Sequence, residues 1–394
     1  MGLYISVPFC RTKCTYCNFA SDVFSKSRFD RYIERVCEDM ANAAQTAEDL
    51  GAQCERLADS IYLGGGTPSL LDPVQLRRLF EAARIHFDVE PQAEITVECA
   101  PGTISDATLE TLIECGVNRV SLGVQSFVDQ EAAAVGRLHT RATVLADVQR
   151  LRHAGIGNIN IDLIAGLPHQ TAESWEFSLG EAIATGAPHV SVYMLEVDED
   201  SRLGRELIAG GTRYHAHFVP DEESTADFYE AACEQLNSAG IAQYEISNFA
   251  RPDFASRHNL KYWTRQPYLG FGVDAHSMLP ALIAGEPDSI RFAGSDSLEQ
   301  FIQGSRLQHT VVTQHSALEE AFFLGLRLNR GVDLQELIQR FGGQAIEPHH
   351  ATIAGLVSNG LLECSEDRIR LTPRGRLLSN EVFERFILAE EIVR

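Results

Sequence analysis

The sequence predicts an α/β protein in which a partial (βα)6 barrel is followed by an α+β extension and a small winged-helix-like domain. Short β-rich runs alternate with amphipathic helical patterns through the first 200 or so residues. Several of these runs end in glycine-rich or polar loops such as GGGTP, ECAPG and GLPHQ. This alternation indicates a parallel sheet with right-handed crossovers. Six units fall short of the eight that close a full barrel.

The elements of the barrel follow one another in chain order. The expected strands are Leu3–Pro8, Ser60–Leu63, Glu94–Glu98, Arg119–Val124, Asn158–Ile164 and Val190–Leu195. The expected helices are Arg28–Ala47, Pro73–Ile85, Ser105–Cys115, Asp129–Val135, Thr143–Ala154 and Ala172–Thr185. The first helix carries Tyr32, Val36 and Met40 at helical spacing, which predicts one buried face.

The alternation ends after about residue 200. Phe218–Gly240 is typical of a helix that ends at its glycine, and an irregular aromatic stretch follows up to Ser277. From about residue 310 the segments ALEEAFFLGLRL, DLQELIQRF and IEPHHATIAGLVSNGLLEC indicate helices, and RIRLTPRGRLLSNEVFERFI indicates a short β-wing and a helix. We therefore expect a barrel at 1–215, an extension at 216–305 and a C-terminal domain at 306–394.

The composition argues against a nucleic-acid-binding, secreted or membrane-spanning protein. Acidic residues outnumber basic ones by 55 to 33, and the formal charge of −22 disfavours nucleic-acid binding. The sequence shows neither a secretory signal pattern nor an apolar run of ~20 residues that would span a membrane. Nine cysteines without a framework pattern are typical of a reducing compartment, so we expect a cytoplasmic location.

Three of the cysteines form a motif, Cys10-x3-Cys14-x2-Cys17, directly after the first expected strand. Three thiolates can hold three irons of a [4Fe–4S] cluster and leave the fourth iron open to a small ligand. Structural zinc normally takes four ligands, and no second cysteine pair or nearby histidine is present. An iron–sulfur cluster is the favoured interpretation, and zinc or plain structural thiols are the alternatives.

Other polar or glycine residues follow the later strands of the expected sheet. They are Gly64–Thr67, Glu98, Gln125 and Asp162. Active sites of such sheets lie at the carboxyl ends of the strands. We therefore expect these residues to share one edge with Cys10.

These motifs resemble the radical S-adenosylmethionine (SAM) superfamily, whose motif Cx3Cx2C lies at the end of the first strand. The resemblance implies that the open iron chelates SAM and that the reduced cluster passes an electron to the sulfonium of SAM. It also implies contacts of the GGGTP segment, with Gly65, Gly66 and Thr67, to the methionine amino group.

The same resemblance implies further SAM-binding side chains. The positions that match the superfamily are Glu98, Gln125, Arg137 and Asp162, and Arg137 and Asp162 are expected to contact only the nucleoside ligand. Tyr4 and Tyr16 match positions beside the cluster, where core packing is an equally good explanation.

Within the superfamily the chain resembles the coproporphyrinogen-oxidase-like branch over nearly its whole length. The oxygen-independent coproporphyrinogen III oxidase has a fourth cysteine at the position of Phe19. The strings CNF, GRLHT, YEISNFA and HNLKYW instead resemble the HemW-type haem chaperones. One departure is Ser6, which stands where the first strand usually carries a histidine, and its presence argues further against the oxidase.

In HemW-type proteins the HNxxYW motif is associated with haem binding, which implies roles for His258, Tyr262 and Trp263. An imidazole can ligate iron and aromatic rings can cover the macrocycle, although core packing explains the same residues. His276, His139 and the pair His349–His350 are alternative ligands.

The resemblance implies a haem chaperone that uses a [4Fe–4S] cluster and SAM and delivers haem to a haem-requiring protein. It is compatible with a homodimer and with peripheral contact to membrane haem proteins. The alternative is a radical SAM enzyme that acts on a porphyrin, either a coproporphyrinogen III oxidase or a haem-modifying or methyl-transferring relative. Whether the chain is an enzyme is left open by the sequence.

Overall fold

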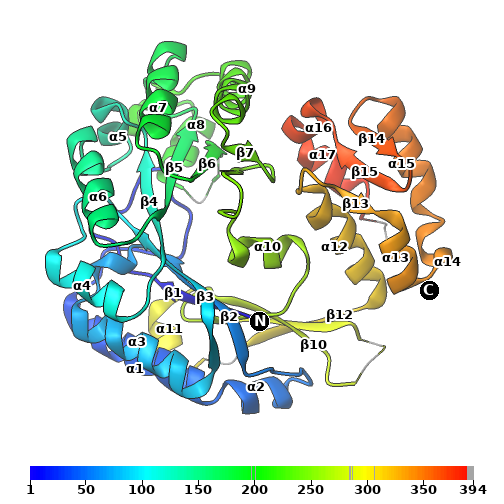
Figure 1. The fold of residues 1–394 in the computed structure, drawn as a ribbon, viewed down its shortest axis with the longest axis horizontal. Helices are drawn as coiled ribbons and strands as arrows, with labels where there is room; N and C mark the ends of the chain where they lie inside the picture. Colours follow the sequence, from blue (N-terminus) through cyan, green and yellow to red (C-terminus); the bar gives the residue numbers. More distant parts are fainter. Residues whose placement is uncertain (197, 200, 284, 286, 306, 388–394) are drawn as a thin grey trace.

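The computed structural model describes residues 1–196, 198–199, 201–283, 285, 287–305 and 307–387. All six predicted barrel strands are present, each hydrogen-bonded in parallel to the next. They are β1 (Gly2–Val7), β2 (Leu57–Gly65), β3 (Asp88–Cys99), β4 (Arg119–Gln125), β5 (Asn158–Ala165) and β6 (His189–Met194). Figure 1 shows these strands curving into an open barrel with helices on its outer side.

The outer helices lie close to the predicted ranges. They are α1 (Phe29–Ala41), α2 (Ala43–Asp49), α3 (Pro73–His86), α4 (Asp106–Glu114), α5 (Asp129–Ala134), α6 (Arg141–His153) and α7 (Ala172–Ala184). The predicted apolar face of α1 is confirmed, since Tyr32, Val36 and Met40 are buried against the sheet. The single helix expected over Arg28–Ala47 is wrong, because the chain breaks at Asn42 into α1 and α2.

The extension completes the sheet. Its strand β9 (Tyr268–Phe271) pairs in parallel with β1, so seven neighbouring strands run the same way. β10 (His276–Pro280), β11 (Ser289–Ala293) and β12 (Gln308–Val312) continue this edge in antiparallel fashion. At the opposite edge lie β8 (Asn248–Ala250) and β7 (Ala242–Gln243).

The elements outside the sheet between β6 and the C-terminal domain are helical. They are α8 (Arg202–Ile208), the 3-10 helix η3 (Arg213–Phe218), α9 (Glu222–Ser238), α10 (Arg257–Trp263) and α11 (Leu298–Gln303). The prediction of an irregular aromatic stretch is therefore wrong. Its strands are only two to five residues long, which is too short to show the alternation of apolar and polar residues that predicts a strand. The barrel strands whose edges they extend lie in distant parts of the chain.

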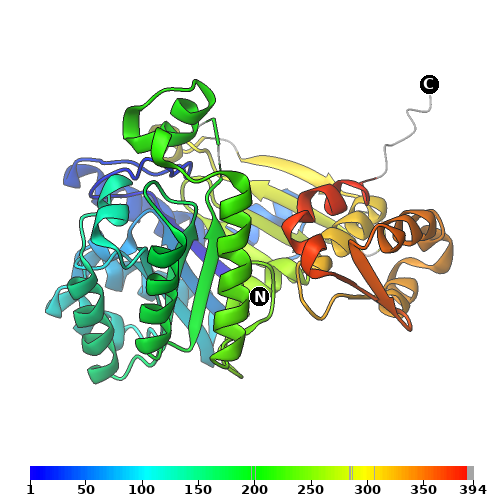
Figure 2. The same ribbon diagram turned by 90° about the horizontal axis from the view of Figure 1, so that it is seen from above.

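The C-terminal part forms a second hydrophobic cluster beside the barrel (Figures 1 and 2). Its helices are α12 (Gln314–Leu326), α13 (Leu334–Phe341), α14 (Gly343–Ile346), α15 (His349–Ser358), α16 (Pro373–Leu377) and α17 (Ser379–Glu384). β13 (Val332–Asp333), β15 (Arg368–Leu371) and β14 (Leu362–Ser365) form a small antiparallel sheet in that order. This arrangement agrees with the predicted small domain and its β-wing. Residues 306 and 388–394 of its expected range lie outside the described residues.

Among the helices that the structure describes, none combines the length and the apolar character needed to cross a bilayer.

Candidate functional site

The cysteine motif lies in a closed loop at the carboxyl end of β1. The loop begins and ends side by side, because the Cys10 amide donates to the Asp22 carbonyl over 3.0 Å. Inside it, Lys13 Nζ donates to the carbonyls of Phe19 and Ser21 over 2.9 and 2.7 Å. These hydrogen bonds tie the two ends and the interior of the cysteine loop together.

The three thiols are partly or fully shielded from solvent. Cys14 is buried, whereas Cys10 and Cys17 are half-buried. Burial raises the pKa of the Cys10 and Cys17 thiols. Among the described residues, no three His, Cys, Asp or Glu side chains converge closely enough to bind one metal ion.

The glycine segment after β2 lies directly against this loop. The Gly66 amide donates to the Val7 carbonyl and the Thr67 amide to the Phe9 carbonyl, both over 2.8 Å. A Cβ on Gly66 would lie 2.8 Å from both the Val7 and Phe9 carbonyl oxygens and 3.0 Å from Cys10 Sγ. The position therefore requires glycine, and the cradle that it forms fits a group bound at the thiols.

Glu98 lies at the end of β3 and points toward the same segment. Its carboxylate accepts from Tyr62 Oη over 2.8 Å and from the Gly65 amide over 3.1 Å. Burial raises the pKa of Glu98 to about 7. The sequence interpretation missed Tyr62, although it lies two residues before Gly64 and therefore on the same face of β2.

Asp162 on β5 is the second buried carboxylate of the barrel interior. It accepts from Ser121 Oγ over 2.8 Å and from Asn160 Nδ2 over 2.7 Å. Burial raises the pKa of Asp162. Within the described residues neither Asp162 nor Glu98 forms a salt bridge, so the interior presents two carboxylates without a directly bonded cation. A cationic ligand would be stabilised there.

Gln125 is the last residue of β4, and the side chain of Arg137, from the loop between α5 and α6, reaches the same strand. Gln125 adopts a left-handed backbone conformation with φ of 68°, and its buried Oε1 has no partner among the described residues. Arg137 Nη1 donates to Cys14 Sγ over 3.7 Å, and its Nη2 donates to the Gly123 carbonyl. The expectation that Arg137 contacts only the nucleoside ligand is therefore wrong, because the fold brings its guanidinium to the Cys14 thiol.

The two tyrosines flank the site from different sides. Tyr4 on β1 lies inside the barrel, with its ring 6.1 Å from that of Tyr62, and burial raises its pKa. Tyr16 lies in the cysteine loop and packs against Val135, Ile164 and Leu167. The apolar contacts of Tyr16 hold the cysteine loop against the barrel, and a role of either tyrosine beside the cofactors stays a prediction.

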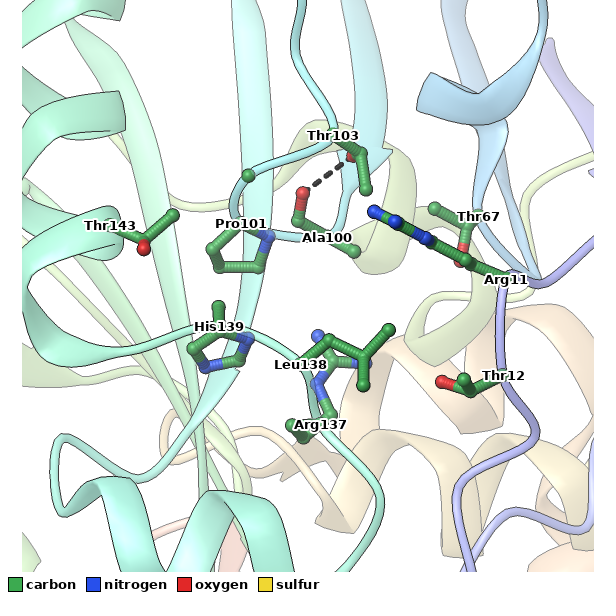
Figure 3. Close-up of a pocket in the computed structure, with 11 residues that line it drawn as sticks. Arg11, Thr12, Thr67, Ala100, Pro101, Thr103, Arg137, Leu138, His139 and Thr143 are labelled. Atoms are coloured by element: carbon green, nitrogen blue, oxygen red, sulfur yellow. Dashed lines mark hydrogen bonds between the residues drawn. The ribbon is translucent and has the colours of Figure 1, made fainter.

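A cavity of about 280 Å³ opens next to the cysteine loop (Figure 3). Its walls come from that loop, from the loops after β2 and β3, and from the segment that joins α5 to α6 and begins α6: Arg11, Thr12, Thr67, Ala100, Pro101, Gly102, Thr103, Arg137, Leu138, His139 and Thr143. Mixed polar and apolar walls of this kind suit a nucleoside. Apart from Thr67 and Arg137, the sequence interpretation assigned none of these residues to SAM. The ECAPG turn after β3 was the available signal.

The predicted haem motif forms α10, a helix at the base of the barrel and away from the cysteine loop. His258 is 1% exposed. Its Nδ1 is bonded to Ser60 Oγ and its Nε2 to Tyr262 Oη, both over 2.9 Å. Burial lowers the pKa of His258 to about 3. Because both ring nitrogens are engaged, ligation of haem by His258 stays a prediction that requires α10 to move.

The other two members of the motif pack into the protein. Tyr262 makes an edge-to-face contact with Tyr268 of β9 at 4.6 Å between ring centroids. Trp263 lies under the Arg327 guanidinium, 4.1 Å from the ring centroid, and its Nε1 has no partner in the described part of the chain. Arg327 ends α12, so the motif joins the barrel to the C-terminal domain.

The alternative histidines are scattered. His139 lines the cavity and its Nε2 is bonded to the Val124 carbonyl over 3.0 Å. His276 is exposed beside Asp274. His349 is buried between aromatic rings in the C-terminal domain, and His350 is exposed. The structure does not bring any of these together with His258.

The chain matches known families at both ends. The family model of the Radical SAM superfamily matches residues 4–180, and that of the HemN C-terminal domain matches residues 312–378. Among solved structures, the coproporphyrinogen III oxidase HemN from Escherichia coli, a radical SAM enzyme, superposes with a TM-score of 0.82. The two are 25% identical, and the match covers 98% of this chain and 89% of that one.

Curated relatives are similar over their whole length. The heme chaperone HemW of Lactococcus lactis is 35% identical, with 98% of this chain and 97% of the relative covered. The heme chaperone HemW of Bacillus subtilis is also 35% identical, with 98% of both chains covered. Such identity over nearly complete chains, together with both domain matches, shows that this chain belongs to the HemW family of the radical SAM superfamily.

Proposed function

We propose that the protein binds haem and delivers it to a haem-requiring protein, and that it carries a [4Fe–4S] cluster and SAM for this purpose. The observation that carries the cofactor part is the loop with Cys10, Cys14 and Cys17 against the Gly66 cradle. Three thiols hold three irons and leave one iron position for SAM. The haem part is supported by the relatives, whose name is heme chaperone HemW.

The residues around the loop have matching tasks in this proposal. When bound, the cluster supplies an electron to SAM. Gly65, Gly66 and Thr67 allow close backbone approach to the methionine end of SAM. The carboxylates of Glu98 and Asp162 attract its positive charges, and the 280 Å³ cavity receives the adenosine.

The haem part of the proposal includes the α10 motif. His258, Tyr262 and Trp263 join the barrel to the C-terminal domain, so haem that contacts them would also sense the position of that domain. We further propose a cytoplasmic location, a homodimer and peripheral contact with membrane haem proteins. Sedimentation analysis with and without haem tests the homodimer.

A second candidate function is a radical SAM enzyme acting on a porphyrin. The superposition with HemN at a TM-score of 0.82 favours it. Two residues argue against an oxidase: Phe19 replaces the fourth cysteine, and Ser6 replaces the usual first-strand histidine. Ser6 is 6% exposed and lies under Gly65, so no histidine from β1 reaches the site.

One experiment separates the two functions. The reconstituted protein is incubated anaerobically with coproporphyrinogen III, SAM and a reductant. In parallel it is loaded with haem and mixed with a haem-free acceptor protein. Transfer of haem without formation of protoporphyrinogen supports the chaperone. Accumulating protoporphyrinogen would overturn it.

A further inference from the structure

A pair of histidines lies near the carboxyl edge of the barrel, outside the residues already discussed. His215 is exposed and belongs to η3, the short helix between α8 and α9. His169 lies in the loop after β5 and is half-buried. Nε2 of His169 and Nδ1 of His215 are 3.0 Å apart, within hydrogen-bond distance.

This hydrogen bond leaves one ring nitrogen of His215 available. In the tautomer that carries the proton of His215 on Nδ1, this N–H donates to Nε2 of neutral His169, and Nε2 of His215 keeps its lone pair. Burial, followed by the nearby charges of His215 and His217, lowers the pKa of His169 and favours its neutral form. In the described part of the chain no hydrogen bond is made by Nε2 of His215. Histidines that ligate a metal typically donate their other ring N–H in this way.

The backbone around the pair is held in an unusual conformation. Tyr214, His215 and His169 have φ of 54°, 61° and 69°, in the left-handed region that side chains rarely adopt. The His169 amide donates to the Phe218 carbonyl over 2.9 Å and connects the two loops. Several strained residues in one place are typical of functional sites.

The surroundings of the pair match the chemistry of haem, which is a flat apolar ring with two carboxylates. Phe218 stacks near His169 and His217, with both ring distances at 4.0 Å, and is 47% exposed. Tyr214, four residues earlier in the same short helix, is 39% exposed. Arg213 opens the same helix, is exposed and forms no salt bridge with any described residue. A guanidinium at this point attracts propionates to a chain whose net charge is −22.

We propose that His215 is an axial ligand of haem iron at the rim of the barrel and that His169 orients its ring. The proposal rests on the proposed haem binding. Ligation by His258 would first require its two ring hydrogen bonds to break. Ligation by His215 requires no change at α10.

The test uses the full-length, cluster-loaded protein and haemin, with difference absorption and paramagnetic-resonance spectra as readouts. In H215A we expect loss of the imidazole-ligated spectrum, and in H215G we expect added imidazole to restore it. H169A should alter the ligand field, whereas H169Q should preserve it, since the amide oxygen of glutamine also accepts from Nδ1. The control H309A removes another exposed histidine, in β12, and should change nothing.

Two results would overturn the inference in different ways. If the wild-type protein binds no haem, the proposed function itself fails and this inference fails with it. If the wild type binds haem and H215A keeps an unchanged spectrum while H258A loses it, only the rim ligand is wrong. Circular dichroism of H215A confirms that its fold is intact.

Discussion

Replacing Glu98 by glutamine is expected to stabilise the protein at neutral and alkaline pH and to weaken its binding of SAM. Glu98 is buried and has no salt bridge among the described residues, and its pKa is raised from 4.5 to about 7. At ~1.36 kcal/mol per pKa unit, ionisation of this carboxyl costs the folded state about 3 kcal/mol. Since glutamine has nearly the same shape and never ionises, E98Q avoids that cost.

The sign of the pH dependence follows from the raised pKa. Below pH 4.5 the carboxyl is protonated in both the folded and the unfolded state, so its ionisation causes little difference in the free energy of unfolding between the wild type and E98Q. As pH rises through about 7, the folded wild type must lose a proton that it holds more tightly than the unfolded chain, and its stability falls relative to E98Q. The difference in free energy of unfolding should therefore grow by about 3 kcal/mol, mostly between pH 5 and pH 8.

Urea unfolding at several pH values measures this difference, with E110Q as the control, because Glu110 is an exposed carboxylate on α4. SAM binding to the cluster-loaded protein provides the functional readout. The wild type should bind SAM more tightly at pH 8 than at pH 6, because the ammonium group of SAM favours the ionised carboxylate, and E98Q should bind weakly at both. A stability difference that does not change with pH would refute the conclusion that burial raises the pKa of Glu98.

Three further predictions concern the cluster site. C14A should lose the brown colour and the iron of the anaerobically purified protein, whereas C115A should keep both; full iron content in C14A would contradict the ligand assignment. G66A should lose about 1–3 kcal/mol of stability and much of its cluster, because the new Cβ meets two carbonyl oxygens at 2.8 Å. G180A in α7, where nothing lies within 4 Å, should gain up to about 1 kcal/mol in the same unfolding assay. R137A should lose iron as well as SAM affinity, since Arg137 contacts Cys14 Sγ; iron content equal to the wild type would show that this contact is dispensable.

The sequence alone determined the strand and helix order of the barrel and the position of the cysteine motif. Both depend on local patterns: alternating apolar periods define the elements, and strand ends in a parallel sheet share one edge. Glu98, Gln125 and Asp162 could therefore be placed near Cys10 without a structure. The short strand β9 escaped prediction because its partner β1 lies more than 260 residues earlier.

The tertiary structure decided the contacts between distant residues. His258 looked accessible in a string of polar and aromatic letters, yet the fold places it against Ser60, 198 residues away, and bonds both of its ring nitrogens. His169 and His215, separated by 46 residues, meet only because the loops after β5 and β6 share the rim. A histidine nitrogen can ligate iron only when no other group is hydrogen-bonded to it. Which groups lie within hydrogen-bond distance is decided by packing between distant parts of the chain, and the neighbouring residues in the sequence do not reveal it.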